Sequence, residues 1–213
     1  TISKVFSITG LGSAFVKETI FSKVKFNLLT HLYSIALNQK KYKVIFQNNS
    51  DLNYILKNTN LKKSNCVLVP GSGVSLKQFK PKKFNFKDPI IMFPSRMLAH
   101  KGIFEFIEAV RILKKKETNA RFVLVGDIDK NNPSGIKIDL IRKWEEENII
   151  ENIIEYWGHK EKMSSILSLA TVIVLPSYRE GFPKVLMEAA ACGRPSITTN
   201  VPGCKDAVVH NYT

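Results

Sequence analysis

The segment VIVLPSYREGFPKVLMEAAACGRP, residues 172–195, decides the fold of this chain. It opens with VIVLP, a near-continuous apolar run of the kind that forms a strand buried on both faces of a parallel sheet. Gly181 then allows close approach of the backbone, and Pro183 stands where the first turn of a helix should begin. A strand, a tight loop and a helix in this order predict one unit of an α/β sheet. The helix N-terminus should lie at the edge where such sheets bind ligands.

Short β-branched runs and longer helical patterns alternate along the rest of the chain, as the units of a parallel sheet require. We expect residues 1–70 to be the C-terminal part of one α/β domain and residues 71–88, rich in Gly, Lys, Pro and Asn, to be an interdomain linker. Residues 89–213 should form a second, doubly wound domain without its last helix. Because the chain starts at Thr1, we expect it to be a piece of a longer protein. Strands are predicted at 5–9, 44–48, 66–70, 90–95, 121–126, 153–158, 172–177 and 195–200, and helices at about 15–37, from 50, and at about 103–116, 135–147, 162–169 and 183–192.

Positive charge is concentrated in the first part of the chain. The whole chain has a formal net charge of +14, and residues 1–88, with 15 lysines and three acidic residues, account for +12 of it. Such a surplus suits nucleic acid, an anionic membrane face or a phosphate-bearing substrate. Nucleic acid is disfavoured, because the lysines have no RNA-binding aromatic signature, helix-turn-helix pattern or zinc-finger spacing beside them.

The three cysteines form no CxxC pair, which argues against a disulfide framework and against a zinc site. No apolar run approaches the 18 residues of a membrane-spanning helix. We therefore expect a cytoplasmic protein that is soluble or peripheral.

Two cations follow the predicted strand 90–95. Arg96 and Lys101 stand five residues apart in RMLAHKG, at the strand end and the helix start. An Arg fork with a Lys point charge suits a diphosphate. The alternative is that both are ordinary surface cations.

Two carboxylates flank the loop of the opening segment. Glu180 precedes the predicted helix and Glu188 lies about two turns into it, so the two cannot easily face one another as the acid/base pair of a glycosidase. They are better suited to accept hydrogen bonds from sugar hydroxyls. A solvated glutamate at each position is the alternative.

Together these residues resemble the retaining GT-B glycosyltransferases of family 4, the "group 1" enzymes of bacterial surface polysaccharides. The family's Glu-x7-Glu motif stands here as Glu180 to Glu188, and its Arg-x4-Lys-Gly motif as Arg96, Lys101 and Gly102. Its hinge motif resembles PGSGVSLKQFKP, residues 70–81, and its late Gly-rich loop resembles VPGCKDAV around Gly203. The resemblance implies an α/β fold of two Rossmann-like doubly wound domains, the N-terminal one only partly present.

The resemblance also implies roles for individual residues. Arg96 and Lys101 would bind the donor diphosphate and, with Glu180, carry catalysis, while Glu188 would hold the ribose hydroxyls. The transferred sugar and the phosphates would contact Glu180, Gly181, Phe182, Pro183 and Lys184. The base would lie against Gly158, His159 and Lys160, unless His159 is only a surface histidine. The resemblance also implies an enzyme that needs no metal and no cofactor. Asp127 and Asp129 in GDIDK form an Asp-x-Asp pair, but they lie in a different loop from any metal motif.

The loop ITGLGSAF follows the first predicted strand. It is a weak match to a dinucleotide fingerprint, because Phe15 stands where Gly or Ala should pack and no acidic residue follows about 20 positions later. By the resemblance, Thr9, Gly10 and Gly12 belong to an acceptor-side loop; a plain strand-to-helix turn is the alternative. The basic, apolar helix that follows could lie on an anionic membrane or pack on its own sheet.

The expected function is transfer of a hexosyl or N-acetylhexosaminyl group, with retention, from a nucleotide sugar. The donor should be a UDP-sugar and the acceptor a polyprenyl-diphosphate-linked or other lipid-linked glycan. This belongs to surface polysaccharide or lipopolysaccharide biosynthesis, at the inner face of the cytoplasmic membrane. The alternatives are a sugar-nucleotide epimerase or phosphorylase on a related two-domain fold, and an inactive nucleotide-binding module. An epimerase should lack the hinge and Glu-x7-Glu patterns, and a phosphorylase would carry a pyridoxal-binding lysine.

Overall fold

The computed structural model describes residues 3–12, 20–37, 40–147 and 154–212. Its contacts divide the chain into two compact units. The first unit consists of Thr1–Gly73 with Arg179–Pro183 and Asn200–Ala207, and the second of Val74–Tyr178 with Lys184–Thr199 and Val208–Thr213. Each unit has its own parallel sheet, which confirms the predicted α/β fold class. The domain limits predicted at residues 70 and 88 stay predictions.

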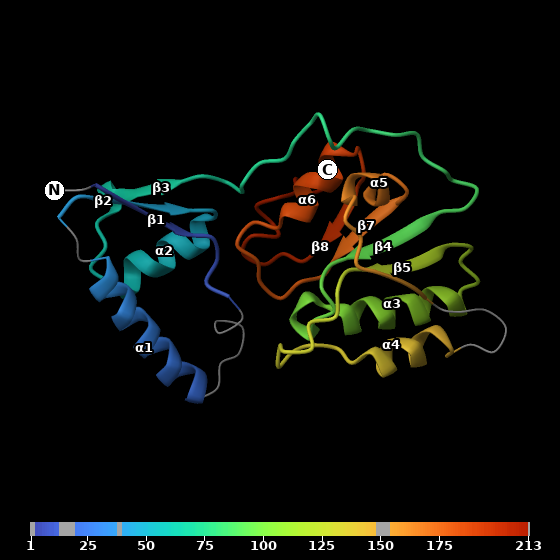
Figure 1. The fold of residues 1–213 in the computed structure, drawn as a ribbon, viewed down its shortest axis with the longest axis horizontal. Coiled ribbons are helices and arrows are strands. Elements are labelled where there is room, and N and C mark those ends of the chain that lie inside the picture. The colour runs from blue at the N-terminus through green and yellow to red at the C-terminus, as the bar shows by residue number, and fades with distance from the viewer. Residues whose placement is uncertain (1–2, 13–19, 38–39, 148–153, 213) are drawn as a thin grey trace. The chain divides into compact units, whose positions relative to one another are not determined.

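The first unit is built on a three-stranded parallel sheet of order β1-β2-β3. Helices connect its strands, as they must between parallel neighbours (Figure 1). Val44, Phe46 and Ile55 are completely inaccessible to solvent and form the centre of its core. The elements are β1 (Lys4–Ile8), α1 (Ile20–Ala36), β2 (Tyr42–Phe46), α2 (Asn49–Asn58), the 3-10 turn η2 (Lys63–Asn65) and β3 (Cys66–Leu68).

The second unit has a five-stranded sheet of order β6-β5-β4-β7-β8, with every neighbouring pair parallel. The order reverses between β4 and β7, which is the switch point where doubly wound sheets bind ligands. Figure 1 shows α3 and α4 on one face of this sheet and α5 and α6 on the other. The elements are β4 (Ile90–Pro94), η3 (Ala99–Lys101), α3 (Ile103–Lys115), β5 (Arg121–Val125), α4 (Ile138–Glu145), β6 (Glu155–Gly158), α5 (Met163–Leu167), β7 (Val172–Leu175), α6 (Lys184–Ala191) and β8 (Ser196–Thr198).

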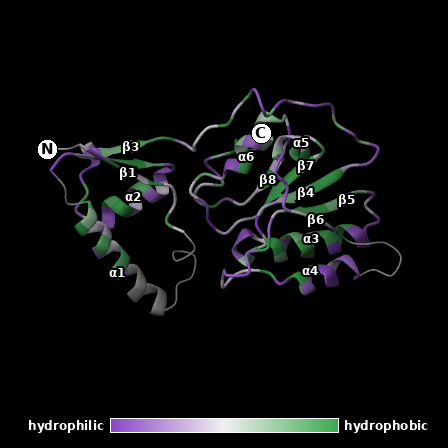
Figure 2. Cartoon of the chain, viewed as in Figure 1, coloured by the Kyte–Doolittle hydropathy of each residue, from purple (hydrophilic) through white to green (hydrophobic). Residues whose placement is uncertain are grey.

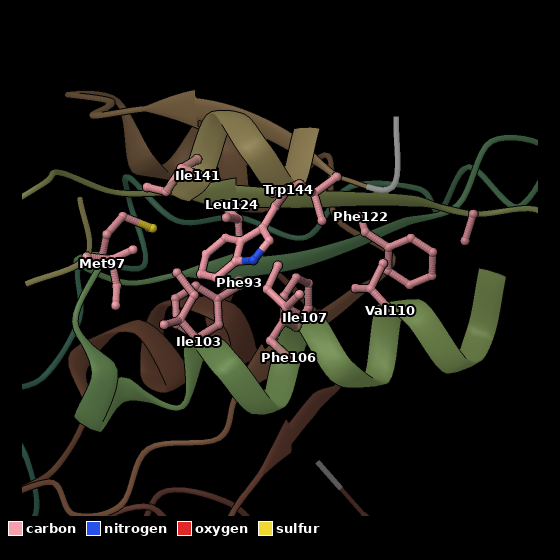
Figure 3. Close-up of a cluster of buried hydrophobic side chains, with 13 residues drawn as sticks. Phe93, Met97, Ile103, Phe106, Ile107, Val110, Phe122, Leu124, Ile141 and Trp144 are labelled. Carbon is pink, nitrogen blue, oxygen red and sulfur yellow. The ribbon is translucent and has the colours of Figure 1, made fainter. Parts of the chain in front are cut away.

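One apolar core lies between this sheet and α3 with α4 (Figure 3). The rings of Phe93 and Phe106 are 5.5 Å apart, and Trp144 packs edge-on to Phe104 at 5.8 Å. Figure 2 shows apolar residues concentrated in the central strands and along one side of α3, while the loops are hydrophilic. This close-packed core fixes the strands of the second unit, and the ends of these strands are the points from which the loops at the sheet edge begin.

Three predicted helices begin later than expected, and the one expected from about residue 162 begins at Met163. The helix expected from residue 135 begins at Ile138, because Gly135 lies in a turn where its N–H donates to the Asn132 carbonyl at 2.8 Å. A Cβ at Gly135 would lie 2.4 Å from the Asp129 carbonyl oxygen, so only glycine fits at this position of the turn. The helix expected from Pro183 begins at Lys184. The start of the helix expected at 15 and that of the strand expected at 153 lie outside the described residues.

Candidate active site

The loops that follow the strands of the second unit meet at one edge of its sheet, because all five strands run in the same direction. Two glycines bring these loops into direct contact. A Cβ on Gly126 would lie 1.9 Å from the Ser95 carbonyl oxygen, and one on Gly102 would lie 2.1 Å from the Pro176 carbonyl oxygen. The segments after β4, β5 and β7 therefore form a single continuous surface that only glycine permits.

Arg96 and Lys101 both lie in the segment that joins β4 to α3 at this edge. The Arg96 side chain is 57% exposed, and its Nη1 donates to Asp129 Oδ2 at 3.0 Å. Lys101 ends η3, and Gly102 after it is the N-cap residue of α3, with φ of 80°. An exposed ion pair of this kind is worth about 1 kcal/mol at most, so an anion can compete with Asp129 for the guanidinium.

Glu188 is the fifth residue of α6, so it lies about one turn into the helix rather than two. It is 8% exposed, which excludes the alternative of a solvated glutamate. Lys184 Nζ lies 3.4 Å from its Oε1. Burial raises the pKa of Glu188, and the nearby Lys184 ammonium opposes that rise. A buried carboxylate with one cationic neighbour retains acceptor capacity for ligand hydroxyls.

Gly158 ends β6 with φ of 67°, and its carbonyl accepts from the Gly126 N–H at 3.0 Å. Tyr156 lies on β6 as well, and its hydroxyl donates to the Gly126 carbonyl at 3.0 Å. Burial raises the pKa of Tyr156, so this hydroxyl keeps its proton. His159 follows as an exposed residue beside this hydrogen-bonded turn.

Residues Arg179–Pro183, which carry Glu180, belong to the first unit together with the loop after β1. A Cβ on Gly181 would lie 1.5 Å from the Thr9 carbonyl oxygen and 3.1 Å from the Gly10 Cα. The Glu180 N–H donates to the Pro202 carbonyl at 3.1 Å. Gly12 has φ of 74°, and no atom lies within 4 Å of the position that a Cβ would take. The positive φ, and not a lack of space, therefore favours glycine at this position.

Two polar residues that the motifs did not include also contact this loop. Asn48 Nδ2 donates to the Gly181 carbonyl at 2.7 Å, and the Asp51 carboxylate pairs with Arg179. The sequence offers one signal for them, because Asn-x-x-Asp before a helical pattern predicts a helix cap. It contains no signal for a partner 133 residues away.

Neither a metal site nor a membrane-spanning helix is present among the described residues. Those residues contain no group of three or more His, Cys, Asp or Glu side chains placed to hold a metal ion. Asp127 Oδ1 instead accepts from the Ile128 N–H at 2.8 Å, and Asp129 pairs with Arg96. Within the same described ranges, no helix combines the length and apolar character needed to cross a membrane.

The chain is similar to known glycosyltransferases. It is 30% identical over 218 residues to N,N'-diacetylbacillosaminyl-diphospho-undecaprenol alpha-1,3-N-acetylgalactosaminyltransferase of Campylobacter jejuni, covering 96% of this chain and 54% of the relative. It is 29% identical over 168 residues to the capsular polysaccharide biosynthesis glycosyltransferase CapM of Staphylococcus aureus, covering 73% of this chain and 43% of the relative. The chain thus spans about half the length of the curated relatives it matches.

The fold is similar to that of solved structures as well. HepE of Anabaena, solved in complex with UDP, superposes with a TM-score of 0.76 at 15% identity, over 97% of this chain and 56% of that chain. Residues 74–213 match the family model described as Glycosyl transferases group 1. Those residues include the whole β4–β8 sheet and the loops at its edge, and the chain therefore belongs to the glycosyl transferases group 1 family.

Proposed function

We propose that this chain is the nucleotide-sugar-binding part of a retaining glycosyltransferase. The proposal depends on one observation: the loops after β4, β5 and β7 are in direct contact where Gly102 and Gly126 leave room for them. They meet at the switch point of a sheet that belongs to the glycosyl transferases group 1 family. That surface presents Arg96 and Lys101 from one loop, and α6 begins directly after the other loop. Cations and the free N–H groups of a helix start are what a diphosphate requires.

In the proposed complex Arg96 and Lys101 bind the diphosphate and Glu188 accepts hydrogen bonds from the ribose hydroxyls. The base lies near Gly158 and His159, and Glu180 with the Gly181–Pro183 backbone and Lys184 contacts the sugar. The nucleotide is proposed to be UDP because a protein of similar fold, HepE, holds UDP. No metal is needed in this scheme, since the positive charge comes from side chains and N–H groups.

The proposed reaction is attack of an acceptor hydroxyl on the anomeric carbon, on the face that the leaving diphosphate vacates, with retained configuration. Negative charge grows on the leaving phosphate as its bond to the sugar breaks. Preorganised cations and N–H groups stabilise that charge, and this is the main catalytic device. A lipid-linked glycan is proposed as acceptor, because the Campylobacter relative is named for transfer to a diphospho-undecaprenol-linked sugar.

The first 88 residues are proposed to face an anionic membrane, and the protein to act at the inner face of the cytoplasmic membrane. Their charge supports this, and so do three exposed apolar residues along α1, namely Leu28, Leu32 and Ile35. A segment with a large surplus of lysines that also exposes apolar helix residues favours anionic lipid. Flotation with phosphatidylglycerol vesicles should recover the chain at low salt and not at high salt; recovery at neither would contradict the proposal.

Calorimetric titration of the chain with UDP, GDP and their sugars tests the donor proposal. We expect UDP or a UDP-sugar to bind and Lys101→Ala to weaken binding about tenfold or more, since a charged hydrogen bond contributes about 1.5–3 kcal/mol. Lys115→Ala is the matched control, because Lys115 is an exposed lysine at the other end of α3. In the complete enzyme, Arg96→Ala should lower turnover about 100-fold. Absence of binding to every nucleotide would refute the proposed function.

A further inference from the structure

Asn48 and Asp51 are two polar side chains with almost no contact with solvent. Asn48 is 2% exposed and Asp51 is 0% exposed, and both lie at the start of α2. Buried polar groups are stable only when they are hydrogen-bonded, and a buried carboxylate only when its charge is also paired. The partners of these two side chains therefore show what they hold in place.

Asn48 forms more hydrogen bonds than a helix cap needs. Its Oδ1 accepts from the Asp51 N–H at 2.8 Å, which is the usual N-cap bond. Its Nδ2 donates to Asp51 Oδ2 at 3.0 Å and to the Gly181 carbonyl at 2.7 Å. A serine would cap α2 equally well, so the amide group has a second use, which is to hold the backbone of Gly181.

Asp51 holds the same loop two residues earlier. Arg179 Nη2 donates to Asp51 Oδ1, and their side chains are 17% and 1% exposed. The pair is shielded from water, so removal of either partner would take a charged hydrogen bond from a side chain that has little access to solvent. Arg179 and Gly181 are thus both tied to the start of α2, and Glu180 lies between these two anchors.

Backbone atoms of two other segments also contact the loop that contains Glu180 and Gly181. Gly181 lies so close to the loop after β1 that no side chain fits between them. Gly203 lies against Glu180, where an added Cβ would be 2.3 Å from the Glu180 carbonyl oxygen. The loop is therefore held from three sides, and the polar side chains of α2 form one of them.

We propose that Asn48 and Asp51 are positioning residues that hold Glu180 and Gly181 in the conformation that binds the donor. The proposal rests on the proposed function, in which Glu180 and the Gly181–Pro183 backbone contact the sugar and the phosphates. It adds two residues that touch no substrate and act through Arg179 and the Gly181 carbonyl.

Asn48→Ser is the decisive variant, because serine keeps the N-cap acceptor and removes the bond to Gly181. Asp51→Asn removes the charge that holds Arg179. Asp88→Asn is the matched control, since Asp88 also pairs with an arginine, Arg121, at 3.1 Å, but at a half-exposed position in the second unit. Each variant of the whole chain would be studied by thermal unfolding, by amide hydrogen exchange without nucleotide, and by titration with UDP-sugar.

In Asn48→Ser we expect the amides of Arg179 to Phe182 to exchange about tenfold faster than in the wild type, which corresponds to about 1.4 kcal/mol. The dissociation constant for UDP-sugar should rise by a similar factor, and the unfolding midpoint should fall by less than about 4 °C. Asp51→Asn should have larger effects on exchange and affinity, and Asp88→Asn should affect neither.

Unchanged loop exchange in Asn48→Ser would overturn the inference, whether or not nucleotide binds. Faster exchange with unchanged UDP-sugar affinity would overturn it too, because the loop conformation would then not matter for the donor. If the wild type binds no nucleotide while Asn48→Ser still frees the loop, the proposed function fails and the anchoring of the loop by α2 stands.

Discussion

Glu188 is subject to two opposing requirements at the scale of a single residue. Burial raises its pKa, so the neutral acid is more favoured in the folded protein than in the unfolded chain. The stabilising contribution of the neutral form is complete below the usual pKa of 4.5 and is lost as the pH rises through the raised value. At neutral pH the ionised side chain therefore opposes folding, while the proposed ribose contact needs that same negative charge.

Glu188→Gln should accordingly change stability and binding in opposite directions. The free energy of unfolding at pH 7.5 should equal or exceed that of the wild type, and its decrease above pH 4.5 should become smaller. The dissociation constant for UDP should rise about 10- to 100-fold, because a charged hydrogen bond becomes a neutral one. Urea unfolding across pH and calorimetry would measure the two effects. Loss of stability with unchanged UDP affinity would contradict the proposed role.

At the scale of elements, the start of α3 is held against the loop after β7. Gly102, the N-cap residue of α3, has φ of 80°, a conformation in which most side chains are disfavoured by about 1–2 kcal/mol. A Cβ there would also meet the Pro176 carbonyl oxygen at 2.1 Å. This approach keeps the Arg96–Lys101 segment beside the segment that leads to α6.

Comparison of Gly102→Ala with Gly73→Ala separates the cost of a positive φ from the cost of the close contact with Pro176. Gly73 has φ of 76° and no atom within 4 Å of its Cβ direction, so its substitution by alanine should cost only about 1 kcal/mol. Gly102→Ala should cost more than about 3 kcal/mol and should also weaken UDP binding, because the two loops must move apart. Urea unfolding and calorimetry would measure both. Equal destabilisation by the two substitutions would show that the contact with Pro176 does not matter.

At the scale of the whole molecule, a buried arginine holds the long segment before β4 against the rest of the second unit. Arg194 is 3% exposed, and its Nη2 donates to the carbonyls of Lys82 at 2.7 Å and Ser168 at 2.8 Å. Its guanidinium lies 4.4 Å from the centre of the Phe84 ring. Burial lowers the pKa of Arg194. The hydrogen bonds from Nη2 and the contact with the Phe84 ring offset part of the loss of water, while Nε has no hydrogen-bond partner among the described residues.

Arg194→Met should release this segment, because methionine can fill the space but cannot donate to either carbonyl. We expect the free energy of unfolding to fall by about 2–4 kcal/mol and a lysine-specific protease to cut faster after Lys82, Lys83 and Lys87. Arg142→Met is the control, since Arg142 is exposed on α4. Cleavage at the wild-type rate in Arg194→Met would mean that the segment is held by other contacts.

Much of the fold could be predicted from the sequence because the relevant signals are local. The runs at β4, β5 and β7 are apolar enough to identify strands buried on both faces, and the helical patterns between them require parallel pairing. Parallel pairing in turn places the segment with Arg96 and Lys101 at one sheet edge. Helix starts were less predictable: Gly135 lies in a turn closed by its hydrogen bond to the Asn132 carbonyl, and the helical pattern of the sequence did not reveal this bond.

The alternation of strands and helices, the sheet edge with the motif residues, and the membership of a transferase family could all be inferred from the amino-acid sequence. Each of these depends on the order of side chains along a short stretch, which is why they can be recognised without coordinates. The folded structure was needed to show that Glu188 is buried, that Asp129 pairs with Arg96, and that Asn48 binds the Gly181 carbonyl. The physical reason is that burial and hydrogen-bond partners depend on residues brought together from distant parts of the chain.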